Sequence, residues 1–331
     1  MKKALITGGS GFLGSNLALH FLKKGEFEVI LCDDLSRKGS DINHHSLKKD
    51  YPYIKHYQVE IGDIPTVIFN EKPDIIFHFA AQVAVTTSIK SPISDFHINA
   101  EGTFLIANAA HKCGIPIIYS STNKVYGDNV NKIPLRELKT RYDFDGKHKN
   151  KGIDEDFPID AMHHTPYGCS KLAGELYVRE FGGIVNRFSC MYGHYQHGIS
   201  DQGWISYFII QKLKKQPITI FGDGKQIRDI LHADDVVRLL EIQAKRLLDT
   251  KKPAINGEVF TIGGGYSNTI SLIELCKILD IKPDFADWRP SDQKVFYCDI
   301  RKVKKMLGWE PRIDYKTGIK DLFEWTNNTL S

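Results

Sequence analysis

Tyr167 and Lys171 are the residues whose types and spacing most directly suggest chemistry. They stand four positions apart in YGCSK, and this spacing places two side chains on one face of a helix. A phenol titrates near 10, which is too high for a base at neutral pH, but a neighbouring ammonium favours the phenolate and lowers that pKa. The pair therefore predicts proton transfer to and from a substrate hydroxyl. A third, hydroxyl-bearing residue is expected at the end of the preceding strand, within residues 119–127.

A glycine-rich turn near the start of the chain predicts where a cofactor binds. Gly8, Gly11 and Gly14 stand in TGGSGFLG, between an expected strand and an expected helix. Glycine allows the tight turn and a close approach of a pyrophosphate, whose charge the helix N-terminus stabilises. The next strand ends in Asp33, a carboxylate placed to accept hydrogen bonds from the ribose of NAD and to repel the extra phosphate of NADP. Arg37 could instead hold that phosphate, so the pattern favours NAD without excluding NADP.

The elements that must position these residues follow an alternating pattern of strands and helices. Short apolar runs at residues 3–7, 28–33, 54–59, 74–80, 115–120 and 184–188 predict strands, and residues 12–24, 99–113 and 166–181 predict helices. This alternation is typical of an α/β protein with a Rossmann-type, doubly wound parallel sheet. We expect residues 1–188, with 229–262 returning to them, to form the NAD-binding domain. Residues 189–228 and 263–331 should form a smaller, partly interleaved α/β lobe for the substrate.

Composition and charge exclude several classes of protein. The 331 residues are 42% hydrophobic and 25% charged, and 44 basic against 40 acidic side chains give a net charge of +4. That charge is too small to predict nucleic-acid binding, although it suits an anionic small molecule or simply a solvated surface. The six cysteines form no CxxC pair or metal-ligand cluster, so we expect no metal and buried thiols in a reducing compartment. With neither a signal peptide nor a membrane-length apolar run, the protein is predicted to be cytoplasmic.

Four motifs together resemble a known family. TGGSGFLG, HFAAQ, SSTNKVYG and PYGCSK are similar to those of the extended short-chain dehydrogenase/reductases, which include nucleotide-sugar epimerases and dehydratases. The resemblance implies NAD as cofactor and Thr122, Tyr167 and Lys171 as catalytic residues. The cofactor-binding residues that it implies, with those predicted above, are Gly8, Gly11, Phe12, Leu13, Gly14, Asp33, Asp34, Ser36, Arg37, Glu60, Ile61, Phe79, Ala80, Ala81, Gln82, Asn99, Ser120, Tyr167, Lys171 and Ser189.

Departures from the family motifs, together with longer sequence segments, indicate one branch of this family. Sugar 4,6-dehydratases carry an Asp-Glu pair after the catalytic Thr, whereas this chain has Asn123-Lys124 and lacks carboxylates for water loss. SSTNKVYGD, TRYDFDG, HTPYGCSK, DQGW, GDGKQIRDILHADD and RPSDQKVFYCDIRK resemble the CDP-paratose 2-epimerase branch. The branch also has an insertion similar to residues 137–164, which we expect to be a long polar surface loop. Glu60-Ile61 stands where the family has the Asp-Ile that contacts adenine, and Asp63 is the competing choice.

The substrate implied by this branch is a nucleotide-diphosphate sugar. Arg228 and Arg289 are the expected diphosphate ligands, since Arg binds phosphate in a bidentate manner. The full set of expected substrate-binding residues is Thr86, Thr122, Asn123, Gln202, Lys225, Gln226, Arg228, Arg289 and Asp292. Residues 99–113 and 166–181 resemble the helices of the family's dimer interface, so a homodimer or homotetramer is expected.

The resemblance implies inversion at C2 of a CDP-3,6-dideoxyhexose, as in O-antigen biosynthesis, by oxidation to a 2-keto sugar and return of the hydride. A 4-epimerase or a reductase acting on another nucleotide sugar would use the same residues. A catalytically silent NAD-binding regulator is the alternative from another class, but such proteins typically lose the Tyr or the Lys, and this chain keeps Tyr167 and Lys171.

Overall fold

A seven-stranded parallel sheet forms the centre of the protein in a computed structural model that describes residues 1–249, 251, 254–289 and 292–330. The strand order is β12-β8-β5-β4-β1-β2-β3, so the chain reverses direction across the sheet between β1 and β4. Ligands of doubly wound sheets bind at such a switch point. The strands are β1 (Lys2–Thr7), β2 (Phe27–Asp33), β3 (Lys55–Gln58), β4 (Ile75–His78), β5 (Ile117–Thr122), β8 (Ile184–Phe188) and β12 (Val259–Ile262).

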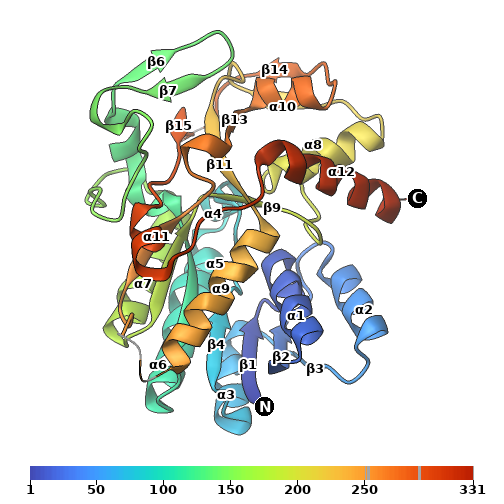
Figure 1. The fold of residues 1–331 in the computed structure, drawn as a ribbon, viewed down its shortest axis with the longest axis vertical. Coiled ribbons are helices and arrows are strands. Elements are labelled where there is room, and N and C mark those ends of the chain that lie inside the picture. The colour runs from blue at the N-terminus through green and yellow to red at the C-terminus, as the bar shows by residue number, and fades with distance from the viewer. Residues whose placement is uncertain (250, 252–253, 290–291, 331) are drawn as a thin grey trace.

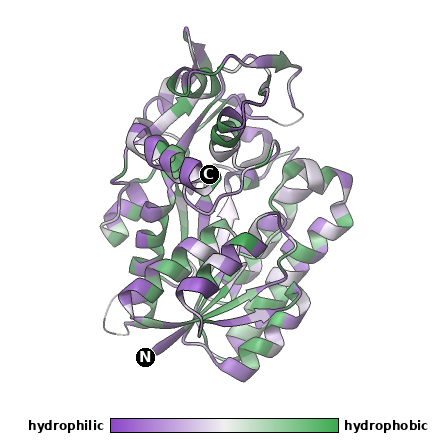
Figure 2. Ribbon diagram, turned by 90° about the vertical axis from the view of Figure 1, so that its right-hand side faces the viewer, coloured by the Kyte–Doolittle hydropathy of each residue, from purple (hydrophilic) through white to green (hydrophobic). Residues whose placement is uncertain are grey.

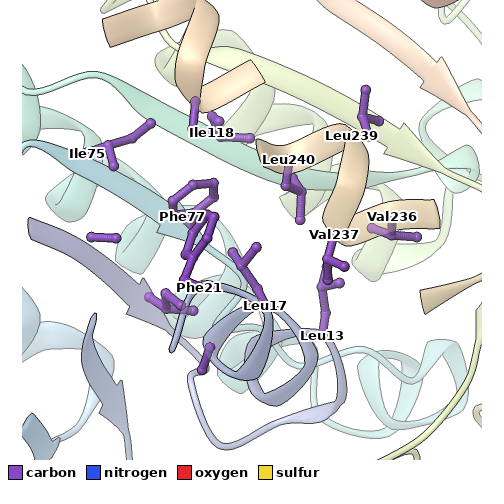
Figure 3. Packing of buried hydrophobic residues seen from close by; sticks show 14 of the residues in the cluster. Leu13, Leu17, Phe21, Ile75, Phe77, Ile118, Val236, Val237, Leu239 and Leu240 are labelled. Atoms are coloured by element: carbon purple, nitrogen blue, oxygen red, sulfur yellow. The ribbon is translucent and has the colours of Figure 1, made fainter. Parts of the chain in front are cut away.

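Helices cover both faces of this sheet because successive side chains of a strand point to opposite faces. Ala4 and Ile6 of β1 pack in one cluster with α1 (Phe12–Lys24), α2 (Ser40–Asp50) and α9 (Ala233–Leu248). Leu5 packs on the other side with α3 (Ile64–Glu71), α6 (Gly102–Lys112) and α7 (Thr165–Glu180). Figure 1 shows the two helical layers, and in Figure 3 Phe21 of α1 lies against Phe77 of β4, with ring centroids 5.5 Å apart.

A smaller lobe lies beyond the carboxyl ends of the central strands (Figure 1). Its largest sheet joins β9, β11, β13 and β15, its pairs β10–β14 and β6–β7 stand beside it, and its own apolar cluster is formed mainly by α8, α10 and α12. The remaining elements are α4 (Val85–Lys90), α5 (Pro92–Phe96), β6 (Leu135–Glu137), β7 (Tyr142–Phe144), β9 (Cys190–Tyr192), α8 (Trp204–Leu213), β10 (Thr219–Phe221), β11 (Ile227–His232), β13 (Thr269–Ser271), α10 (Leu272–Ile278), β14 (Asp284–Ala286), β15 (Val295–Phe296), α11 (Arg301–Leu307) and α12 (Tyr315–Leu330).

The α/β fold class with a parallel central sheet is confirmed. α9 and β12 pack in the central layers, whereas β11 belongs to the small lobe, and the division into two domains stays a prediction. Figure 2 shows mixed hydrophilic and hydrophobic residues along the outer helices, as amphipathic surface helices require. Within the described ranges, no helix combines the length and apolarity needed to cross a membrane.

Two expectations about buried and exposed segments were wrong. Residues 137–164 are not simply a polar surface loop, because Phe144 and Ile153 are buried and Ile153 pairs with Cys298 of the small lobe. Their apolar side chains are too few to form a periodic pattern, yet they complete a core shared with distant residues. The thiols are not uniformly buried either, since Cys113 and Cys169 are exposed on the ends or outer faces of helices.

Candidate active site

The glycine-rich turn joins β1 to α1 at the switch point of the sheet. Gly8 has φ +65°, and a Cβ on it would lie 2.8 Å from the backbone nitrogen of Ala80 beyond β4. A Cβ on Gly14 would lie 2.2 Å from the carbonyl oxygen of Gly8. The turn can therefore keep its tight packing only with glycine at these positions. No side chain caps α1 at Gly11, so the helix N-terminus stays available to an anion.

This turn opens into a cavity of about 650 Å³, a volume typical of small-molecule sites. Sixteen of the twenty predicted cofactor residues line it, and the substrate candidate Gln202 lines it as well. Glu60 and Ile61 are part of the wall, whereas the competing Asp63 is not. The sixteen are Gly8, Gly11, Phe12, Leu13, Gly14, Asp33, Asp34, Ser36, Arg37, Glu60, Ile61, Phe79, Ala80, Ala81, Gln82 and Ser120.

Asp33 ends β2 with its carboxylate on the cavity wall. Its Oδ2 accepts a hydrogen bond from the backbone N–H of Ser10 at 2.9 Å, and its Oδ1 accepts one from Leu35 at 2.9 Å. Burial is the main cause that raises its pKa, and these N–H donors act in the opposite direction. The carboxylate is thus held rigidly beside the glycine turn, where the ribose of a dinucleotide bound at that turn would lie. The close-packed glycines, the open helix end and this carboxylate all fit NAD.

The four predicted cofactor residues away from this wall have other surroundings. Asn99 holds the backbone of Gln82 through two hydrogen bonds, of 3.0 Å to the N–H and 2.8 Å to the carbonyl. Ser189 donates to the buried carboxylate of Asp229. Tyr167 and Lys171 lie one helical turn apart on α7 and are both buried. Asn99 therefore holds the cavity wall at Gln82, whereas Ser189 is bonded to a carboxylate outside that wall.

The segment that covers the cavity was not predicted from the sequence. Tyr195, Gln196, His197 and Ile199 line it from the segment that leads into α8. Asn43 of α2 fastens this segment, because its Nδ2 donates to the carbonyl of Tyr195 at 3.0 Å and its Oδ1 meets Nε2 of His197 at 2.9 Å. No signal in the sequence marks this contact, because the burial of Asn43 is visible only in the fold.

Thr122 and Tyr167, two of the three predicted catalytic residues, lie close together. Thr122 ends β5, and its hydroxyl lies close enough to Tyr167 to lower the pKa of that phenol, while it accepts a hydrogen bond from the backbone N–H of Lys124 at 3.3 Å. Burial nevertheless raises the pKa of Tyr167 to about 12, against the smaller lowering by Thr122 and by the charge of Arg37. The expected lowering of this pKa by Lys171 is therefore wrong for the chain alone. Desolvation of the phenolate outweighs the charges around it.

Lys171 lies over the ring of Tyr119, with Nζ 4.3 Å from its centroid. Burial lowers the pKa of Lys171 to about 7, while the carboxylates of Glu175 and Asp95 act to raise it. Glu175 is itself paired with Arg187, whose Nη2 is 2.8 Å from Oε2. The ammonium of Lys171 thus depends on negative charge buried behind the site.

A second buried network joins α5 to α7. The Oδ1 atom of Asp95 accepts hydrogen bonds from Gln82 Nε2 at 2.8 Å and from Asn99 Nδ2 at 3.0 Å. Ser170, beside Lys171, donates to Oδ2 of the same carboxylate. Asp95 therefore ties the cavity wall at Gln82 to the helix that carries the catalytic candidates.

Two of the nine substrate candidates line a second cavity of about 520 Å³. Arg289 and Asp292 line it, with Trp288, Lys294 and three others that were not predicted. Arg228 Nη2 donates to Asp292 Oδ1 at 2.8 Å, and Arg289 Nη2 is 3.3 Å from Asp201. Both guanidinium groups therefore face carboxylates. A diphosphate would have to displace these carboxylates or bind the guanidinium groups beside them.

The other substrate candidates are held by neighbouring side chains. Thr86 donates to Asp201 at 3.0 Å, and Asn123 donates to Gln293 at 3.0 Å. Lys225 forms an ion pair with Glu137 at 2.5 Å, and Gln226 is buried and donates to the carbonyl of Phe221 at 2.7 Å. Lys225 and Gln226 are thus committed to contacts within the small lobe. Among the residues that the structure describes, no cluster of three metal-ligating side chains occurs.

A doubly wound sheet, a glycine turn with a carboxylate beside it, and a Thr-Tyr-Lys set are typical of the short-chain dehydrogenase/reductase class. Comparison with known proteins places the chain within it. The sequence profile of the NAD dependent epimerase/dehydratase family matches residues 4–263, and the chain belongs to this family. The predictions of an NAD-dependent, epimerase-type enzyme and of NAD as cofactor are thereby confirmed.

Individual relatives cover the chain almost from end to end. CDP-paratose 2-epimerase of Salmonella typhi is 39% identical, over 98% of this chain and 99% of the relative. The putative UDP-glucose 4-epimerase of Methanocaldococcus jannaschii is 30% identical over 98% of both. Among solved structures, the UDP-glucuronic acid 4-epimerase of Bacillus cereus in complex with UDP-glucuronic acid and NAD has a TM-score of 0.80 at 26% identity, covering 99% of this chain and 100% of that one.

Proposed function

We propose that this enzyme inverts C2 of a CDP-3,6-dideoxyhexose. The observation that carries the proposal is the 39% identity with a CDP-paratose 2-epimerase over nearly the whole of both chains. Asn123-Lys124 supports it, because no carboxylate stands beside Thr122 to carry out the proton transfers of a dehydratase. The proposed substrate is held by the Arg228–Asp292 pair and by Arg289, in the small lobe.

The glycine turn around Gly8 and the carboxylate of Asp33 would hold NAD, which would supply an acceptor for the hydride of the sugar carbon and the donor that returns it after the keto sugar has turned over. Tyr167 removes the proton of the C2 hydroxyl as the hydride leaves and gives it back when the hydride returns. Thr122 forms a hydrogen bond to the oxygen of the sugar C2 hydroxyl and stabilises the charge of the developing carbonyl. With a pKa of about 12 in the chain alone, Tyr167 needs further positive charge to act as a base, and an oxidised nicotinamide carries such charge.

The second candidate is inversion at C4 of another nucleotide sugar. A 30% identical relative is a putative UDP-glucose 4-epimerase, and a structure with UDP-glucose bound, the 4-epimerase of Thermotoga maritima, has a TM-score of 0.81 at 27% identity. The same Thr122, Tyr167 and Lys171 would serve that reaction. The two candidates differ in which carbon of the sugar faces Tyr167.

The deciding experiment presents CDP-, UDP- and GDP-sugars to the enzyme in ordinary and deuterated water and follows the products by NMR. We expect inversion at C2 of a CDP-sugar without deuterium at that carbon. Deuterium at C2 would show proton abstraction from carbon and overturn the hydride mechanism. Inversion at C4 would establish the second candidate, and stoichiometric consumption of added NADH would indicate a reductase.

Tyr167→Phe tests the role given to the phenol, because it removes only the hydroxyl. Loss of a general base lowers turnover by about 10²–10⁴-fold, and the variant should still contain NAD. A variant that keeps parental turnover would exclude Tyr167 as the base.

We further propose a cytoplasmic homodimer or homotetramer that associates through α6 and α7. Leu176 and Tyr177 of α7 are exposed by 56% and 46%, and the ring of Tyr177 lies against that of Phe104 of α6, with centroids 4.8 Å apart. Apolar side chains gathered in this way are typical of a protein–protein contact.

A further inference from the structure

A short turn at residues 199–202 closes one side of the cofactor cavity. Ile199 and Gln202 exchange two backbone hydrogen bonds, of 2.9 and 3.1 Å, and both line the cavity. Gly203, which follows at φ +73°, allows the chain to turn directly into α8. The turn is therefore a defined structure that presents the Gln202 side chain to the cavity.

Gln202 is hydrogen-bonded to another residue of the cavity wall, Arg37. Arg37, in the loop after β2, donates from Nη2 to Oε1 of Gln202 at 2.6 Å. The backbone of Arg37 stands near Asp33, at the proposed ribose end, yet its charge acts on the Tyr167 hydroxyl and lowers the pKa of that group. Arg37 is therefore both bonded to Gln202 and close enough to Tyr167 for its charge to act there.

The neighbouring residue fastens the same turn on the substrate side. Asp201 accepts a hydrogen bond from Thr86 of α4 at 3.0 Å and faces Arg289 at 3.3 Å. Arg289 also donates to the carbonyl of Ser200 at 3.1 Å. The turn is consequently held by three segments that are distant in sequence, which keeps Gln202 in place against Arg37.

We propose that Arg37 and Gln202 form a clasp that retains the dinucleotide. The guanidinium lies over the pyrophosphate, opposite the N-terminus of α1, and Gln202 holds it there. Arg37, Lys38 and His197 are the residues of the described cavity wall that can carry positive charge, and the bond to Gln202 distinguishes Arg37. The inference rests on the proposed position of NAD and is independent of which sugar reacts.

Retention matters because the proposed reaction returns the hydride to the sugar from which it came. Loss of the reduced cofactor in mid-cycle would leave a keto sugar with no hydride to take back. A hydrogen bond with one charged partner, if lost, changes an equilibrium by about tenfold or more. We therefore expect that breaking the clasp raises the rate of NAD release by about tenfold.

The experiment compares Gln202→Leu, Arg37→Met and the double variant with the parent. Each protein is loaded with isotopically labelled NAD, mixed with excess unlabelled NAD without any sugar, and sampled over time. Gln216→Leu is the matched control, because it makes the same chemical change at an exposed position outside the cavity. Both single variants should release NAD about tenfold faster, and the control should match the parent.

The double variant distinguishes a clasp from two separate contacts. If Arg37 retains NAD only while Gln202 holds it, the double variant releases NAD no faster than Arg37→Met, whereas independent effects would multiply. Arg37→Lys keeps a charged donor and should lie between the parent and Arg37→Met. Parental release rates in both single variants, or multiplying effects in the double variant, would overturn the clasp. Because no sugar is present, these outcomes do not depend on whether C2 epimerisation is correct.

Discussion

Removing the charge of Glu175 should destabilise the protein more than almost any other single charge change. Glu175 is fully buried on α7, and its oxygens accept hydrogen bonds from Arg187 Nε at 3.1 Å and Nη2 at 2.8 Å. Ser121 of β5 also donates to it. Arg187 is only 3% exposed in its side chain. Glu175→Gln therefore leaves a guanidinium in the interior without a countercharge.

The expected loss follows from the cost of an unpaired buried charge. Breaking a buried pair by removing one partner costs about 3–5 kcal/mol. Gln keeps one acceptor oxygen for Arg187, so we expect a loss of about 3 kcal/mol, against a total stability of about 5–15 kcal/mol for a typical protein. The substitution also removes the carboxylate that raises the pKa of Lys171, so that pKa should fall below about 7.

Urea unfolding, with parent and variant at the same NAD concentration, measures the loss. Glu324→Gln is the control, because Glu324 pairs with Lys320 at 3.8 Å on the surface with 64% and 79% of the side chains exposed, and such pairs contribute about 0–1 kcal/mol. The double variant Glu175→Leu/Arg187→Met should lose less than the sum of its single variants. If Glu175→Gln is as stable as Glu324→Gln, the reasoning about the buried pair is refuted.

Three further changes test other parts of the structure. Asp33→Ala removes the carboxylate beside the glycine turn, so the affinity for NAD should fall about tenfold or more and the preference for NAD over NADP should shrink. Calorimetric titration of NAD-free enzyme with both cofactors measures the two affinities, and an unchanged ratio between them would contradict this prediction. Burial lowers the pKa of His78 to about 3, so its stabilisation is present above pH 6.5 and is lost as the pH falls from 6.5 toward 3. His78→Asn should therefore reduce the slope of unfolding free energy against pH in this range by up to about 1.4 kcal/mol per pH unit. A slope equal to the parent's would argue against a neutral His78. Leu176→Lys should give monomers in sedimentation if α7 forms the proposed interface, and a parent that is already monomeric would exclude that interface.

The local parts of the fold were predictable from sequence because their signals are local. The glycine turn, the helix at residues 12–24 and the strand at residues 184–188 have the predicted bounds, since glycine spacing and runs of apolar residues report on a few neighbouring positions. The same holds for the lining of the cofactor cavity by the motifs around Gly8 and Gln82. Each of these motifs follows a central strand, so the order of the sheet brings them together.

What could not be predicted depends on contacts between distant residues. Gln202 was predicted to bind the substrate, and no motif indicated that it would also line the cofactor cavity and accept a hydrogen bond from Arg37, far away in sequence. Residues 137–164 were taken for a surface loop, but Phe144 and Ile153 find their apolar partners in the C-terminal third of the chain. The pKa of Tyr167 was expected to fall, and burial, which no motif reports, raises it.

Arg228→Met tests the proposed position of the substrate diphosphate. Arg228 pairs with Asp292 at 2.8 Å and donates to the carbonyl of Ile227 at 2.7 Å, so part of its charge is already neutralised. A charged hydrogen bond is worth about 1.5–3 kcal/mol, and the lower figure corresponds to a KM about tenfold higher. The diphosphate does not change during the reaction, so this binding is equal in ground and transition states and kcat should stay unchanged.

Steady-state kinetics on the nucleotide sugar and competition by the free nucleoside diphosphate separate the possible results. Both KM and the inhibition constant of the diphosphate should rise together, since both ligands carry the group that Arg228 binds. Arg238→Met is the matched control, because Arg238 also pairs with a buried Asp, Asp235 at 2.6 Å, but lies on α9 outside both cavities. A fall in kcat with unchanged KM would place Arg228 at the reacting carbon instead, and the sugar would then have to lie in the opposite orientation.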